Sequence, residues 1–168
     1  MIAIDAMVLI YAGIVPQLNK ADSKKLNDLT LRSKILLHIH RKDMLVLSTI
    51  AVAEILVPVP KKEKGKLISI LSERFVLADF NAQAAAIAAE IWSEHKKLPA
   101  DMQYKKRLVL KADSMIVASA KAVGADEFYT SDNNCRKLAK LVMDGYDLPK
   151  DDPNDMFLKR DIEDGVFD

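Results

Sequence analysis

Four acidic residues lie in apolar surroundings or directly after a short apolar segment. Asp5 follows the apolar segment 1–4 and has no Lys or Arg within ten residues on either side. Glu54 and Asp113 have only apolar residues or Pro three and four positions away, so a helix offers neither of them a local cationic partner. Asp132 follows the segment 127–130 by one residue. A buried, unpaired carboxylate is costly unless its pKa shifts until it is neutral, so these residues require an explanation.

For each acid alone, a structural role as a helix cap or a hydrogen-bonded core carboxylate is as good an explanation as a functional role. All of them together are explained most simply if they converge and share a cation. A set of carboxylates without Cys or suitably spaced His favours Mg²⁺ or Mn²⁺. Such a site activates water for in-line attack on a phosphodiester, and a further carboxylate can accept the proton. The sequence contains no competing Ser/His/Asp set, Gly-rich phosphate loop or nucleophilic Cys signature.

Short apolar strands that alternate with helices would position these acids. Hydrophobic patterning predicts strands at 1–4, 44–47, 75–78 and 127–130. It predicts helices at 6–14, 22–41, 50–57, 63–73, from the Asn81 cap to residue 97, at 107–123, and from residue 133 to about 142. The alternation indicates an α/β fold with a mainly parallel sheet, whose functional crevice lies beyond the carboxyl ends of the strands.

Length and composition favour a single globular domain. The chain has 168 residues, of which half are hydrophobic, and one Cys, which excludes an intramolecular disulfide framework. A basic leader and an apolar run of about 18 residues are both missing from the sequence, so we expect a cytoplasmic protein that does not enter a membrane. Residues 1–143 carry a net charge of +7 and residues 144–168 a net charge of −6. A basic body is compatible with a polyanionic partner such as RNA.

The order and contexts of the acids resemble the PIN-domain nucleases over about residues 1–145, which leaves 146–168 as an acidic C-terminal tail. The segments that carry the resemblance are the N-terminal strand ending in Asp5, the stretch 48–55 with Glu54, the Asp-x-x-Ile-x-Ala-x-Ala helix from Asp113, and the segment 128–132 with Thr130 and Asp132.

This resemblance implies a three-layer α/β/α sandwich with a mainly parallel central sheet and a Mg²⁺- or Mn²⁺-dependent endoribonuclease. Asp5, Glu54 and Asp113 would bind the metal, and Asp132 would complete the site directly or through water. Thr130 would orient Asp132 or a metal-bound water. Many small prokaryotic members, the VapC-like toxins, are held inactive by a cognate antitoxin and form homodimers, so the resemblance also implies both of these partners.

Two positions depart from the family pattern and leave alternatives open. Ala6 and Met7 occupy positions where the family often has Ser or Thr and then another small polar residue. The main alternative is therefore a catalytically weak PIN-like module that binds RNA or protein. A phosphatase with an N-terminal Asp is a weaker alternative, since Met7 stands where its second Asp is expected. Asn133 follows Asp132 where some members have another acid, and it could still ligate the metal or contact a phosphate.

Two charged segments could contact or mimic RNA. Lys105, Lys106 and Arg107 precede the helix of Asp113, so we favour them as a contact with the RNA backbone, although a solvated surface is the alternative. The acidic tail is expected either to be a solvated chain end or to fold across the basic groove as an RNA mimic.

Overall fold

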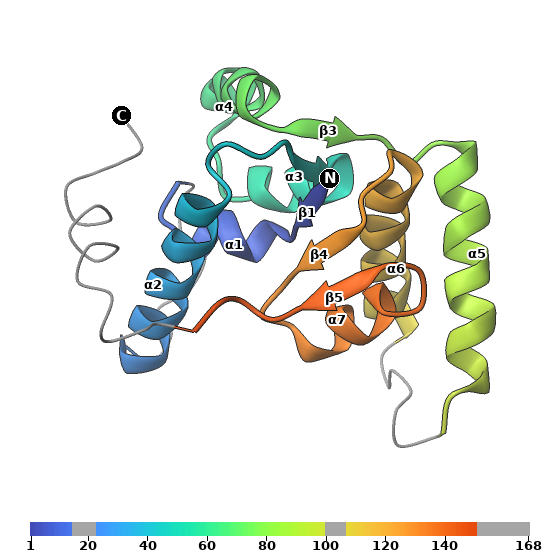
Figure 1. Cartoon of the computed structure of the whole chain (residues 1–168). Helices are drawn as coiled ribbons and strands as arrows, with labels where there is room; N and C mark the ends of the chain where they lie inside the picture. The colour runs from blue at the N-terminus through green and yellow to red at the C-terminus, as the bar shows by residue number, and fades with distance from the viewer. Residues whose placement is uncertain (15–22, 100–106, 151–168) are drawn as a thin grey trace.

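A computed structural model of the protein describes residues 1–14, 23–99 and 107–150, apart from the side chains of residues 23–25 and 107. In these ranges the chain forms strands and helices in alternation (Figure 1). In chain order they are β1 (Ile2–Ile4), α1 (Ala6–Tyr11), α2 (Ser23–Ile39), β2 (Leu45–Ser48), α3 (Thr49–Leu56), α4 (Lys61–Arg74), β3 (Val76–Ala78), α5 (Ala82–Lys97), α6 (Arg107–Ala122), β4 (Glu127–Tyr129), α7 (Asn133–Ala139) and β5 (Asp144–Tyr146).

The strands form one parallel sheet in the order β3-β2-β1-β4-β5. The chain builds the sheet outward from β1 to β3, and then returns to place β4 on the other side of β1. Ile4 therefore pairs with Leu47 on one side and with Tyr129 on the other. This reversal creates a crevice beyond the carboxyl ends of β1 and β4, the place where open α/β sheets bind ligands. The predicted α/β fold with a parallel sheet is confirmed.

Helices cover both faces of the sheet and give the expected three layers. Because parallel crossovers are right-handed, the connections through α1–α4 lie on one face and those through α5–α7 on the other. α6 packs along α5 and against α7, while α1 contacts α2 and α3 (Figure 1). Phe128, Ile4 and Leu47 are each at most 1% exposed, so the central strands lie within the core. None of the helices in the described ranges is long and apolar enough to cross a membrane.

Most of the predicted elements are present, with shifted ends. Ser48 caps α3, since its hydroxyl accepts a hydrogen bond from the Ile50 amide at 3.2 Å, and Asn81 caps α5 in the same way. The first helix ends at Tyr11 and not at residue 14, and the last helix ends at Ala139. The fifth strand, β5, was not predicted, and it continues across the expected end of the domain at residue 145.

Candidate active site

Asp5 lies at the carboxyl end of β1, next to the end of β4. It directly follows β1 and begins α1, and its side chain is only 8% exposed. Its amide donates to the Tyr129 carbonyl at 3.1 Å, which fixes its backbone to the end of β4. Burial raises the pKa of Asp5 above its usual value, the hydroxyl of Thr130 and nearby amides lower it, and the charge of Asp132 raises it again. The protein thus holds a carboxylate where ionisation is unfavourable.

Thr130 links two of the acids. Its side chain is fully buried, and its hydroxyl donates to Oδ2 of Asp5 at 2.8 Å while accepting from the amide of Asp132 at 3.0 Å. The hydroxyl therefore uses both its donor and an acceptor lone pair between these two residues. This one buried side chain thus fixes the position of the loop after β4 relative to the end of β1.

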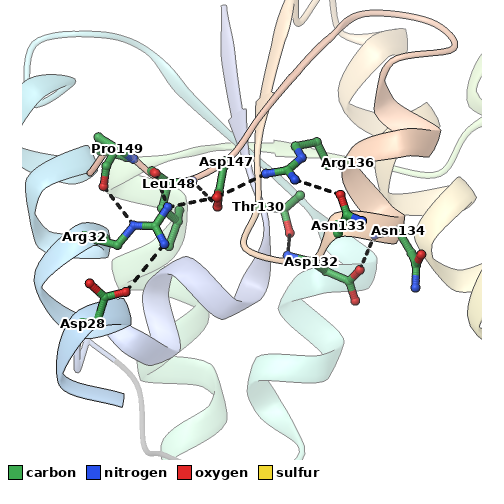
Figure 2. Close-up of polar contacts among 10 residues, drawn as sticks. All are labelled: Asp28, Arg32, Thr130, Asp132, Asn133, Asn134, Arg136, Asp147, Leu148 and Pro149. Carbon is green, nitrogen blue, oxygen red and sulfur yellow. Dashed lines mark hydrogen bonds and ion pairs between the residues drawn. The ribbon is translucent and has the colours of Figure 1, made fainter. Parts of the chain in front are cut away.

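Asp132 begins α7 and lies at the exposed rim of the crevice. Its Oδ1 accepts from the amides of Asn134 at 2.6 Å and Cys135 at 3.2 Å, as a helix-capping residue does. Asn133 is also exposed, but its side-chain oxygen accepts from Arg136 at 2.8 Å (Figure 2). In this structure Asn133 therefore contacts Arg136.

Glu54 and Asp113 approach the crevice from α3 and α6. Asp113 is half-buried, but Glu54 is exposed, so the expectation of apolar burial was wrong for Glu54. The two turns around Glu54 are apolar because they pack on the core from the other side of α3. The Glu54 carboxyl group is nevertheless partly desolvated, and this burial together with the charges of Asp5 and Asp113 raises its pKa to about 7. The Glu54 carboxylate is therefore close enough to interact electrostatically with both acids.

The effect of nearby charges on the Cys135 thiol indicates that all four acids lie around it. It is 2% exposed at the start of α7. Burial and then the charges of four carboxylates raise its pKa well above the usual value, and these carboxylates are Asp5, Asp113, Asp132 and Glu54. A thiol with a raised pKa is a poor nucleophile. The fold thus brings the four predicted acids around one end of the sheet.

The donor chemistry of this cluster fits a hard divalent cation. The candidate ligands are carboxylate oxygens, which Mg²⁺ and Mn²⁺ prefer, and a cation would relieve the repulsion that adds to burial in raising the pKa of Glu54. Among the residues that the structure describes, no group of three His, Cys, Asp or Glu side chains is close enough to share one ion. Metal binding would therefore require the side chains to draw closer. Glu54 is free to do so through rotamer changes, since its side chain is exposed.

A cavity of about 500 Å³ adjoins Asp132 and contains residues that sequence reasoning missed. Its lining includes Met7, Tyr11, Arg32 and Asp147. Arg32 lies in α2, and its position in an amphipathic helix gave no sign of a functional contact. Asp147 was assigned to the acidic tail, but it lies in the described structure and pairs with Arg32 (Figure 2).

Other expected contacts lie outside the described residues. Lys105 and Lys106 precede the first described residue of α6, and of Arg107 only the backbone is described. The RNA contact that we expect from these residues remains a prediction. The same is true of the tail beyond residue 150.

Comparison with known proteins identifies related sequences and folds. The sequence model of the PIN domain matches residues 2–141. A solved structure described as VapBC2 from Rickettsia felis bound to a DNA fragment from their promoter contains a similar chain, with a TM-score of 0.56 and 18% sequence identity. The similarity covers 89% of this chain and all of that one. None of the curated proteins compared with the chain matches it.

Proposed function

Because the chain belongs to the PIN-domain family, we propose that it is a Mg²⁺- or Mn²⁺-dependent endoribonuclease and the toxin of a toxin–antitoxin pair. The observation that carries the proposal is the arrangement around Thr130. This buried hydroxyl joins Asp5 to the loop of Asp132, while Glu54 and Asp113 approach from two helices. The structural neighbour belongs to a VapBC complex, which supports an antitoxin as partner.

In this proposal Asp5, Glu54 and Asp113 hold the metal, and Asp132 completes the site directly or through water. A bound divalent ion supplies a water of lowered pKa and neutralises charge on the phosphate oxygens. Thr130 fixes the orientation of the Asp5 carboxylate, and the buried position of Asp5 preserves that orientation in the free protein. Asp132 keeps the start of α7 beside the crevice through its two amide contacts. A homodimer and a cytoplasmic location remain predictions that rest on the family resemblance.

Cleavage of total RNA tests this proposal. We expect cleavage by the wild-type protein with Mn²⁺ or Mg²⁺, none with EDTA, and none by Asp5→Asn or Asp113→Asn. Glu90→Gln is the matched control, because it removes one exposed negative charge from α5 without touching the cluster. Loss of cleavage in the two site variants but not in Glu90→Gln would support the metal site. Cleavage that persists in EDTA or in Asp5→Asn would contradict it.

A catalytically weak PIN-like binding module is the second candidate. The observations that favour it are Ala6 and Met7 beside Asp5, where a hydroxyl is missing, and the separation of the acids within the described residues. This candidate predicts RNA or protein binding without cleavage over a range of metals. Titration of Mn²⁺ followed by thermal denaturation separates the two. A stabilisation by metal that Asp5→Asn abolishes favours the nuclease, and no stabilisation in either protein favours the module.

A further inference from the structure

Asp147 is held between two arginines that come from distant parts of the chain. Its Oδ2 lies 3.1 Å from Nη2 of Arg32 on α2 and 3.3 Å from Nη1 of Arg136 on α7 (Figure 2). Partial burial raises the pKa of Asp147, but the hydrogen bond from Arg32, the Leu148 amide and both arginine charges outweigh it and hold the pKa below its usual value. A single anionic oxygen shared by two guanidinium groups is an arrangement that phosphate oxygens also adopt.

Both arginines are more buried than the carboxylate between them. Arg32 also pairs with Asp28 at 3.6 Å and donates to the carbonyls of Leu148 and Pro149, and its side chain is 14% exposed. Arg136 donates to Asn133, and its side chain is 23% exposed. The side chain of Asp147 is 45% exposed, so it can rotate away by giving up its two ion pairs and the 2.8 Å hydrogen bond that its Oδ1 accepts from the Leu148 amide, while both guanidinium groups keep their other contacts. The carboxylate is therefore the replaceable member of this cluster.

The cluster adjoins the proposed catalytic acids. Arg32 and Asp147 line the same cavity of about 500 Å³ as Ser131 and Asp132. Asp28 and Asp132 also line this cavity and repel an approaching phosphate, so an RNA strand that enters it needs cationic contacts. Among the described residues that line this cavity, Arg32 alone is cationic, and Arg136 is joined to it by their shared ion pair with Asp147.

We propose that Arg32 and Arg136 form a binding site for a backbone phosphate of the RNA next to the one at the acids, and that Asp147 occupies this site in the free protein. The inference rests on the proposed function, since continuity with the acid cluster is what favours RNA over an acidic peptide. Asp147 then acts as an internal competitor that RNA must displace. The remaining contacts of Arg32 keep residues 148 and 149 in place when this happens.

RNA affinity measured by fluorescence anisotropy tests this site. The probe is a short, labelled, single-stranded RNA of mixed sequence, and all variants carry Asp113→Asn and are measured with Mg²⁺ so that cleavage does not interfere. We expect Asp147→Asn to bind about two- to fivefold tighter, as a partly exposed charge competitor is removed. The slope of log affinity against log salt should steepen by about 0.7 for one additional phosphate contact. Glu90→Gln, with the same change in net charge on α5, should change the affinity much less.

A double variant separates the site from a general charge effect. In the Arg136→Gln background the gain from Asp147→Asn should shrink, because only Arg32 is then freed and one of the two cations of the site is gone. Thermal denaturation of each variant verifies that it folds. Equal affinities of Asp147→Asn and Glu90→Gln, or an undiminished gain without Arg136, would overturn the inference while leaving the proposed function intact. No RNA binding by any variant would overturn both.

Discussion

Replacing Thr130 by Val removes one hydroxyl from a fully buried position with almost no change in shape. The hydroxyl donates to an acidic carboxylate at 2.8 Å, and hydrogen bonds to charged groups contribute about 1.5–3 kcal/mol. The Asp132 amide loses its acceptor as well, which costs about 1 kcal/mol more. The added methyl group offsets about 0.8 kcal/mol. We therefore expect Thr130→Val to lower the free energy of unfolding by about 2–3 kcal/mol at neutral pH.

The pH dependence identifies the charged partner. Thr130 lowers the pKa of Asp5, so its removal raises that folded-state pKa further above the ordinary value of 3.8. The stability advantage of the wild type is then complete above the pKa of the variant and declines as the pH falls through both folded-state values. Urea denaturation in EDTA over a pH series measures this difference. Thr130→Ser is the control, since it keeps the hydroxyl and loses only a methyl group. Equal stability of Thr130→Val and Thr130→Ser, or a difference that does not change with pH, would refute the reasoning.

Two further changes test the acid cluster and the end of the sheet. Asp5 has a raised folded-state pKa, so its ionisation lowers the stability of the fold as the pH rises from the ordinary value of 3.8 through that pKa. We expect Asp5→Asn to raise the Tm of the metal-free protein at neutral pH and not at acidic pH, as followed by scanning fluorimetry in EDTA. An unchanged Tm would contradict this. A Cβ on Gly145 would lie 2.7 Å from the Arg136 carbonyl oxygen, so Gly145→Ala should destabilise the fold by about 1–3 kcal/mol in chemical denaturation. Gly65→Ala, in open space within α4, should instead stabilise it by about 0.5–1 kcal/mol, and equal effects of the two would rule out the proposed clash.

These predictions share one physical basis, which is that the crevice holds negative charge at a cost in stability. The pKa values of Asp5 and Glu54 are both raised, so ionisation of either carboxyl group opposes folding at neutral pH. Structural contacts such as that of Thr130 offset part of this cost and fix the geometry of the site. A cation that binds there would stabilise the folded state by mass action.

Local sequence was sufficient for most of the helices and for four of the strands. Apolar runs and capping residues such as Ser48 and Asn81 act within a few residues, so their effect is visible in the sequence. The same local patterns marked Asp5 and Asp132 as residues at strand ends. Exposure of Glu54 was missed because apolar neighbours in a helix do not show which side of it faces solvent.

The fifth strand and the ion pairs of Asp147 with Arg32 and Arg136 could not be predicted from local sequence patterns. β5 contains Asp144, Gly145 and Tyr146, which have little strand preference as a set, and it forms because β4 offers an edge for pairing. Gly145 is required there because the Arg136 carbonyl lies too close for a side chain. The contact of Asp147 with Arg32 joins residues 115 positions apart, and no local pattern reports such a partner.

The sequence by itself determined the alternating α/β architecture and the acids that a metal site would need. Burial produces a periodic pattern of apolar residues and capping places particular residues at helix ends, so both are visible in the local sequence. The tertiary structure decided which of these residues meet. Only the return of the chain to place β4 beside β1 brings Thr130 to Asp5 across 125 residues. Non-local pairing of this kind depends on the order of the strands, and the strand order is set by the packing of the whole chain and not by any single segment.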